Sequence, residues 1–392
     1  MLDFQYYSPT RVVFGRHALD QLGPLLKAKG RQKILLHYGG GSVRRNGILD
    51  AVKQQLELAG VTYLELGGVE PNPKIGLIRT GVELCKSEHV DFILAVGGGS
   101  TIDSAKAIAM GAKIDFDVWN LYETKQRICD ALPVGSVLTI AAAGSELSDG
   151  SVVTNPEGGL KRDYGSDYLR PEFAIMNPEY TFSVSKYQTA CGTVDILMHT
   201  FERYFTHTPN VDLTDELAEG LCRAVIRAGT AAVANGCDYE ARATLMWAGS
   251  ISHNDLTGLG RKSDWATHQI EHELSGQYDC VSHGAGLAAI FPAWCHYVWR
   301  EEPERFARFA EKIWGVNRDG MSTEEAALEG IRRCEAYFHS IGMPTRLCEL
   351  GIDSAHLHEM AVKATYFGRR TLGSFKVLQE ADIEAIYQTA LK

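Results

Sequence analysis

The chain has 392 residues and a formal net charge of −10, with 45% hydrophobic and 22% charged residues. This composition is typical of a globular protein and excludes the disordered and fibrous classes. The acidic balance, without any run of lysine and arginine, argues against a nucleic-acid partner. No apolar stretch reaches the roughly 18 residues of a membrane-spanning helix, so no membrane partner is expected.

The chain starts with Met1–Gln5, which has neither the basic region nor the apolar region of a signal peptide. The nine cysteines are scattered without a CxxC pair, a pattern that indicates reduced thiols and not a disulfide framework. We therefore expect a cytoplasmic protein.

The first half of the chain alternates short apolar runs with amphipathic stretches. Runs of three glycines follow two of the predicted strands, at residues 39–41 and 97–99. A strand, a glycine turn and a helix in repetition are typical of a parallel sheet with crossover helices. The sequence thus predicts an α/β domain over residues 1–185. Its strands are expected at 33–38, 61–66, 92–96 and 137–140, and its helices from about 42 to 56, over 78–86 and from about 101 onward.

The second half has helical apolar spacing almost throughout. In one stretch the apolar residues follow an i, i+4, i+7 course, at Leu217, Leu221, Ala224, Val225 and Ala228. This pattern predicts an all-helical domain over residues 186–392. We expect a cleft between the two domains, because domain interfaces and the carboxyl ends of parallel strands are preferred ligand sites.

The glycines at 97–99 follow a strand and open a helix that carries Asp103 near its start. A helix N-terminus presents unpaired backbone N–H groups, and glycine lets a pyrophosphate approach them closely. The pattern therefore indicates a dinucleotide site. The alternative interpretation is a tight turn in which Asp103 is only a favourable first-turn carboxylate.

The earlier run, Gly39–Ser42, occupies the end of the first clear strand and has no carboxylate to bind a ribose 2′-OH. It is followed by Arg44 and Arg45, which would suit a 2′-phosphate. These residues favour NADP over NAD, although NAD stays possible. Alternatively, the glycines only form a turn and the arginines are solvated.

Two pairs of possible metal ligands stand four residues apart in the helical half. Asp195 and His199 form one pair, His268 and His272 form the other, and His283 follows in a loop. A spacing of four puts both members of a pair on one helix face. Imidazole and carboxylate together suit Fe²⁺ or Zn²⁺. The alternatives are a side-chain hydrogen bond within a pair and histidines satisfied in the core.

A second class of function fits part of the same stretch. Residues 268–272 match H-x-x-E-H, the inverted zincin pattern of some metalloproteases. In that interpretation His268 and His272 bind zinc and Glu271 is the general base. It leaves the glycine-rich half and the pair at Asp195 and His199 unexplained.

Over essentially its whole length the sequence resembles the iron-containing (group III) alcohol dehydrogenases, in the branch of NADP-type butanol dehydrogenases and aldehyde reductases. The motifs that carry the resemblance are Pro9–Gly15, Gly39–Ser42, Pro71-Asn72-Pro73, a GGGSxxDxxK string from Gly97 to Lys106, and Asp264–His268. The family's fold implies a Rossmann-type domain joined to a helical domain, as in dehydroquinate synthase. The resemblance also implies activity on short aliphatic alcohols and aldehydes, and a homodimer.

The resemblance further implies roles for matching positions. One divalent metal, Fe²⁺ or Zn²⁺, would be bound by Asp195, His199, His268 and His283, with His272 beside the nicotinamide as a candidate proton relay. The catalytic residues would then be His272, Asp195 and His268. His268 and His283 are fifteen residues apart, where close relatives tend to have fourteen. The coenzyme would be lined by Gly39, Gly40, Ser42, Asn72, Gly98, Gly99, Ser100, Asp103, Thr139, Ser148 and Lys161.

Overall fold

The computed structural model describes all 392 residues and divides into two compact units. The α/β unit comprises Tyr7–Val184 and Gly236–Asn254, and the helical unit comprises Met1–Tyr6, Ser185–Asn235 and Asp255–Lys392. The units are therefore not contiguous in sequence, unlike the expected division into residues 1–185 and 186–392. Helix α9 (Tyr239–His253) belongs to the α/β unit, where it packs on the 3-10 turn Pro178–Thr181.

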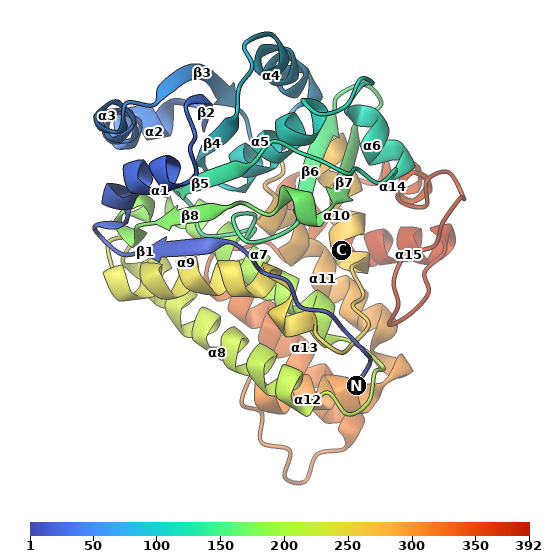
Figure 1. Ribbon diagram of the computed structural model, residues 1–392. Coiled ribbons are helices and arrows are strands. Elements are labelled where there is room, and N and C mark those ends of the chain that lie inside the picture. The colour runs from blue at the N-terminus through green and yellow to red at the C-terminus, as the bar shows by residue number, and fades with distance from the viewer. The chain divides into compact units, whose positions relative to one another are not determined.

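The α/β unit contains a six-stranded sheet in the order β1-β8-β5-β4-β2-β3, in which every neighbouring pair is parallel (Figure 1). This confirms the predicted α/β class. Strand β8 and the antiparallel hairpin of β6 and β7 were not predicted. The strands are β1 (Arg11–Phe14), β2 (Lys33–Gly39), β3 (Thr62–Val69), β4 (Phe92–Gly97), β5 (Val134–Leu138), β6 (Gly150–Asn155), β7 (Leu160–Gly165) and β8 (Phe173–Met176).

Both faces of the sheet are buried, which explains why its strands are continuous apolar runs. On β4, Ile93 and Ala95 join one hydrophobic core, while Leu94 and Val96 join the other. The first core is shared with α4 (Ile75–Ser87), α5 (Gly99–Gly111) and α6 (Trp119–Thr124), and the second with α1 (Leu22–Ala28), α2 (Gly41–Arg45) and α3 (Ile48–Ala59).

A buried histidine on β2 connects this strand and the edge strand β3 to α5. The Nδ1 of His37 lies 2.8 Å from the carbonyl oxygen of Leu66, and its Nε2 lies 2.8 Å from the hydroxyl of Ser104. A carbonyl only accepts, so Nδ1 donates and Nε2 accepts. Burial lowers the pKa of His37 to about 4, outweighing the hydrogen bond to Leu66. A neutral imidazole therefore links β2, β3 and α5 close to the two glycine turns.

The helical unit is formed around α7 (Lys186–Tyr204), which is buried from Thr189 to its end. The helix begins at Ser185, whose hydroxyl accepts a hydrogen bond from the Gln188 N–H. No helix combines the length and the apolar character that crossing a bilayer requires. The other helices of this unit are α8 (Asp212–Ala234), α10 (Ala266–Gln277), α11 (His283–Val298), α12 (Pro303–Lys312), α13 (Thr323–Ser340), α14 (Leu357–Ala364) and α15 (Glu380–Leu391).

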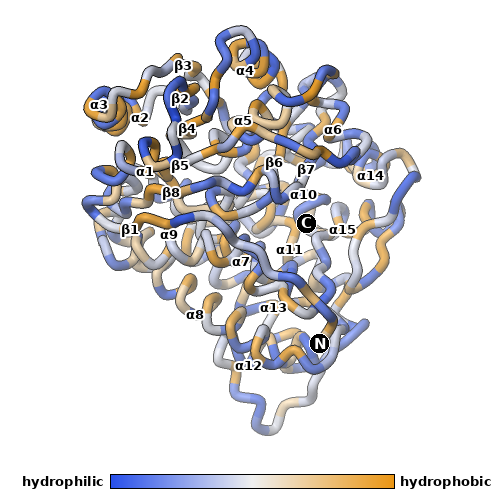
Figure 2. The backbone as a smooth tube through the Cα atoms, viewed as in Figure 1, coloured by the Kyte–Doolittle hydropathy of each residue, from blue (hydrophilic) through white to orange (hydrophobic).

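The buried stripe of α8 agrees only in part with the predicted one. Val225 and Ala228 are buried as predicted, but Leu217 is 41% exposed, and Ala218 and Cys222 are buried in its place. Figure 2 shows the resulting alternation of hydrophobic and hydrophilic segments along α8. The reason is close helix packing, because a Cβ on Gly229 of α8 would lie 2.4 Å from a methyl carbon of Thr193 on α7. Small residues therefore face α7, and the larger leucines lie beside the contact.

Candidate functional site

Asp195 and His199 project from consecutive turns of α7, as their spacing predicts. Both are buried, with exposures of 4% and 3%, and the His199 Nδ1 lies 3.4 Å from the Asp195 Oδ1. Two buried ionisable side chains require compensation by partners or a bound ion.

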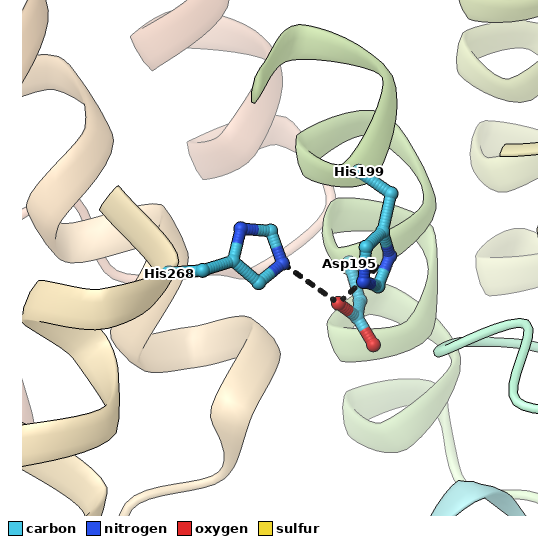
Figure 3. Close-up of side chains that lie close together, drawn as sticks. All are labelled: Asp195, His199 and His268. Atoms are coloured by element: carbon cyan, nitrogen blue, oxygen red, sulfur yellow. Dashed lines mark ion pairs between the residues drawn. The ribbon is translucent and has the colours of Figure 1, made fainter. Parts of the chain in front are cut away.

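Two further imidazoles approach the same carboxylate oxygen from other helices. The Nε2 of His268, on α10, lies 3.8 Å from Asp195 Oδ1, and the Nε2 of His283, the first residue of α11, lies 3.7 Å from it. Figure 3 shows His268 pointing from its helix toward the pair on α7. The structure thus brings all four predicted metal ligands to one point.

The donor set fits a divalent ion bound by nitrogen and oxygen. Ligand atoms around a tetrahedral ion with bonds of about 2.0–2.2 Å lie roughly 3.3–3.6 Å apart. The separations from Asp195 Oδ1, 3.4–3.8 Å, are close to this range. The Oδ1 of Asp195 and the Nε2 of His268 are also buried without a hydrogen bond, which is the arrangement expected of ligand atoms.

A second layer of carboxylates surrounds the imidazoles. The Oε1 of Glu202 accepts hydrogen bonds from the His268 backbone N–H at 2.7 Å and from its Nδ1 at 3.0 Å. Burial opposes the charged form of His268, but Asp195 and Glu202 outweigh it and raise its pKa to about 9. The two carboxylates therefore make the surroundings of His268 strongly negative, which favours a bound cation. The sequence analysis missed Glu202, although its position three residues after His199 places it near the same helix face.

A second group of possible metal ligands consists of Glu271, His272 and His283. The donor atoms of Glu271, His272 and His283 all lie within 4.8 Å of one another, and His268 is not among them. The Glu271 carboxylate is fully buried and hydrogen-bonded to the Nδ1 of His283. Its Oε2 is thus engaged by a histidine inside the protein, whereas the general base of a protease must reach a water molecule at the substrate. This geometry does not support the H-x-x-E-H protease interpretation.

Trp265 lies beside two of the predicted metal ligands, His199 and His268. It precedes α10 with a φ of 68°, in the left-handed region that bulky residues rarely adopt. Its ring centroid lies 5.2 Å from that of His268 and 6.0 Å from that of His199. The Arg203 guanidinium stacks on the other part of the indole at 4.5 Å and donates to the His199 carbonyl at 2.7 Å. Backbone strain of this kind concentrates at functional sites.

Four of the predicted coenzyme residues lie at or just beyond the carboxyl ends of strands of the parallel sheet. Gly39 ends β2, Asn72 follows β3, Gly98 follows β4 and Thr139 follows β5. The Thr139 N–H donates to the Gly97 carbonyl at 3.0 Å, which ties two of these turns together. Asn72 has a φ of 53° and is 8% exposed. The carboxyl edge is where open α/β sheets bind ligands.

The glycines at the start of α5 are required by packing as well as by any ligand. Gly98 is the N-cap residue, and no side chain caps the helix. A Cβ on Gly98 would lie 2.1 Å from a methyl carbon of Ile140, and one on Gly99 would lie 2.9 Å from the Cβ of Ala143. At Gly40, in contrast, a Cβ would meet nothing within 4 Å. The tight turn and the phosphate site are therefore compatible interpretations of the same glycines.

Asp103 and Ser148 hold a loop in place. The Asp103 carboxylate accepts from the Ser145 hydroxyl at 2.5 Å and from the Val152 N–H at 3.0 Å, and burial raises its pKa despite Lys106. Lys106, fully buried, donates to the carbonyls of Ser145 at 2.7 Å and of Ser148 at 2.8 Å. Burial lowers the pKa of Lys106 to about 8. The sequence analysis assigned no role to Lys106.

The two arginines after the first glycine run differ in their surroundings. Arg44 donates to the Tyr38 hydroxyl at 2.5 Å and lies over that ring. The Arg45 guanidinium lies against Gly41, where an added Cβ would be 2.3 Å from its Nη1. Both arginines belong to α2, which also contains Ser42. Lys161 lies on β7 and is 5% exposed.

Comparisons with known proteins agree along the whole chain. The family model described as iron-containing alcohol dehydrogenase matches residues 9–178, and the C-terminal model of the Fe-containing alcohol dehydrogenase family matches residues 189–391. The chain is 43% identical to the probable NADH-dependent butanol dehydrogenase 1 of Bacillus subtilis, with 100% of both proteins covered. It is 35% identical to the NADPH-dependent aldehyde reductase YqhD of Escherichia coli, covering 95% of each.

Solved structures show the same relationship. The crystal structure of the NADH-dependent butanol dehydrogenase A of Thermotoga maritima superposes with a TM-score of 0.96 at 38% identity, covering 100% of this chain and 99% of that one. A crystal structure of Escherichia coli YqhD gives a TM-score of 0.92 at 33% identity, covering 99% of each chain. The chain therefore belongs to the iron-containing alcohol dehydrogenase family and is an oxidoreductase of the alcohol dehydrogenase class.

Proposed function

We propose that the protein is a metal-dependent, NAD(P)-linked enzyme that oxidises short-chain aliphatic alcohols and reduces the corresponding aldehydes, of the butanol and butyraldehyde type. The observation that carries the proposal is the convergence of Asp195, His199, His268 and His283, whose imidazole nitrogens lie 3.4–3.8 Å from one carboxylate oxygen. The names of the Bacillus subtilis and Escherichia coli relatives support this substrate class.

In this proposal the four side chains hold one Fe²⁺ or Zn²⁺ ion, two metals that accept nitrogen and oxygen ligands alike. Such an ion supplies Lewis-acid polarisation of a substrate carbonyl or hydroxyl oxygen. Asp195 contributes the negative charge to the ligand set. Glu202 places a second carboxylate against the Nδ1 of His268. Trp265, next to two of the imidazoles, excludes water from one side of the reacting group.

His272 is the proposed proton relay. Its ring centroid lies 5.6 Å from that of His283, outside the group of Asp195, His199 and His268. In this proposal the His272 imidazole exchanges the proton with the substrate oxygen, the role that histidine most often has in general acid–base catalysis. The nicotinamide supplies or accepts the hydride. The chain's task is then to hold the two reacting carbons in contact.

The coenzyme is proposed to bind at the carboxyl edge of the sheet, with its pyrophosphate at the N-terminus of α5. The residues implied by the family resemblance, from Gly39 to Lys161, would line it. The sequence favours NADP because no carboxylate follows β2, and the Arg45 guanidinium packs against Gly41 in that turn. The named relatives include both NADH-dependent and NADPH-dependent enzymes, so NAD is the alternative coenzyme.

The direct test is turnover with restored metal. Metal-depleted protein supplied with Fe²⁺ or Zn²⁺ should oxidise NADPH when butyraldehyde is added. The reaction is measured as the loss of NADPH absorbance. Turnover should be absent without the metal. A protein that oxidises neither NADPH nor NADH with any aliphatic aldehyde, whichever ion is restored, would contradict the proposed function.

Coenzyme preference should depend on Arg45 more than on Arg44. A charge-assisted hydrogen bond is worth about 1.5–3 kcal/mol, so Arg45→Ala should lower kcat/KM for NADPH about ten-fold or more. The value for NADH should change little. Arg44→Ala is the matched control, because the Arg44 side chain is engaged with Tyr38. Equal losses with both coenzymes in the Arg45 variant would refute a role in 2′-phosphate binding.

We also propose that the protein is a cytoplasmic homodimer. All nine cysteines are free thiols, and Cys129, Cys237, Cys280 and Cys348 are exposed, which suits a reducing compartment. Strand β1 is an edge of the sheet, where Phe14 is 41% exposed, and edge strands offer unpaired backbone groups to a second copy. The molar mass by light scattering tests the dimer, and the mass of a single chain would exclude it.

A further inference from the structure

Glu271 is a buried carboxylate that the proposed reaction does not use directly. It lies on α10 three residues after His268, with no exposed surface. Its partner is the Nδ1 of His283, the ring nitrogen opposite the one that faces Asp195. A buried charged side chain persists only where it is paired, so this contact is a defined part of the fold.

His283 is the candidate ligand that most needs such a partner. Its side chain is 24% exposed, against 4–6% for those of His199 and His268. It is the first residue of α11 and follows a turn in which Asp279 and Cys280 are exposed. The other three ligands lie inside helices, whereas His283 is attached to helical backbone on one side only. Its direction must therefore be determined by side-chain contacts.

The facing helix is shaped to admit Glu271. A Cβ on Gly286, one turn after His283, would lie 2.8 Å from the Glu271 Oε1 and 2.9 Å from its Cγ. Any larger residue at 286 would displace the carboxylate. The close approach of α10 and α11 at this point thus depends on a glycine whose absent side chain leaves room for Glu271.

We propose that Glu271 is a positioning residue that holds His283 in the metal site. By accepting a hydrogen bond from Nδ1, its carboxylate keeps the proton on that nitrogen and leaves the Nε2 lone pair directed toward Asp195. Outer carboxylates of this kind orient metal-binding histidines and raise their basicity. Glu202 stands in the same relation to His268. The inference rests on the proposed function, because it assumes that His283 is a ligand.

The test is a double-mutant cycle on metal affinity. Dissociation constants for Zn²⁺ and Co²⁺ would be measured by competition with a chromogenic chelator for the wild type, Glu271→Ala, His283→Ala and the double variant. Loss of an outer-shell partner typically costs 10–100-fold in metal affinity, and we expect a loss of that order in Glu271→Ala. Because Glu271 acts through His283, the double variant should bind no more weakly than His283→Ala alone.

Two further variants separate positioning from general damage to the fold. Gly286→Ala removes no polar group but displaces Glu271, so it should weaken metal binding and shift the Co²⁺ absorption spectrum toward that of His283→Ala. Glu273→Gln changes a buried carboxylate on the same helix that belongs to neither histidine group, and it should leave affinity and spectrum unchanged.

The outcomes are distinguishable. Wild-type affinity in Glu271→Ala, or a loss that adds fully to that of His283→Ala, would overturn the inference and leave the proposed function intact. A wild type that binds neither Zn²⁺ nor Co²⁺ would overturn both. Partial retention of affinity in Glu271→Gln, whose amide oxygen still accepts a hydrogen bond from Nδ1, would support the positioning role.

Discussion

Replacing Asp195 by alanine is expected to remove the bound metal and to abolish nearly all aldehyde reduction. Asp195 is the only carboxylate in the group with His199 and His268. A nitrogen of each of these two imidazoles lies within 4 Å of its Oδ1, at 3.4 Å for His199 and 3.8 Å for His268. Metal polarisation is worth several kcal/mol in the transition state, and each 1.36 kcal/mol is tenfold, so kcat/KM should fall by about 10³-fold or more. Metal content by plasma mass spectrometry and kcat/KM for butyraldehyde measure the two effects.

The matched control lies on the same helix. Thr193 is fully buried, and its hydroxyl donates to the Thr189 carbonyl of α7 at 2.9 Å. Thr193→Ala should therefore retain both metal and activity. If Asp195→Ala kept a full complement of metal after dialysis, the ligand set proposed here would be wrong.

Replacing Lys106 by methionine should destabilise the α/β unit and weaken coenzyme binding together. The Lys106 ammonium donates to the carbonyls of Ser145, Ser148 and Gly150 at 2.7–2.8 Å. Each buried acceptor left without a donor costs about 1–3 kcal/mol, so the loss of all three bonds should lower the free energy of unfolding by about 3 kcal/mol or more. The loop from 145 to 150 would also lose its anchor beside the N-terminal half of α5, and we expect KM for NADPH to rise. Thermal unfolding and steady-state kinetics measure the two effects.

Lys113 offers a matched control just beyond the end of α5. Its ammonium pairs with Asp130 at 3.2 Å, and both side chains are exposed. Exposed pairs contribute about 0–1 kcal/mol, so Lys113→Met should leave Tm and KM nearly unchanged. If Lys106→Met unfolds at the wild-type temperature, the anchoring role of Lys106 is refuted.

The central sheet could be predicted from the sequence because its strands are buried on both faces. Runs such as Phe92–Val96 are apolar without interruption and end in glycines. Continuous apolar runs of this kind are typical of strands in a parallel sheet that is buried on both faces. Strand β8, Phe173–Met176, was missed because four residues carry little periodic signal. The hairpin of β6 and β7 was also missed, although Pro156-Glu157-Gly158-Gly159 between its strands is a turn signal.

The helical half shows what apolar spacing cannot resolve. On α8 the pattern of large apolar residues pointed to Leu217, whereas the packed face consists of small residues one position on, beginning at Ala218. Close helix approach favours small side chains, and hydrophobicity alone does not report which neighbour will approach closely. The fold class was therefore predictable, and so was the later part of the buried face, at Val225 and Ala228, but the earlier part of that face was not.

For the candidate metal centre, local spacing predicted part of the arrangement and long-range contacts supplied the rest. Asp195 and His199 meet because of helix geometry, which the sequence displays directly. Glu202 and His268 are 66 residues apart, and nothing in the spacing of either residue identifies the other. Residues that orient a ligand become visible only once the fold has brought their helices together.

Trp265 has one more consequence, for the evolution and engineering of this protein. Glycine would relax its left-handed backbone, but glycine also makes the unfolded chain more flexible, so this replacement is not expected to stabilise the protein. The same replacement would remove the indole that lies beside the imidazole rings of His199 and His268. Tryptophan therefore stays favoured at this position despite its strained backbone, and libraries screened for activity are expected to retain it.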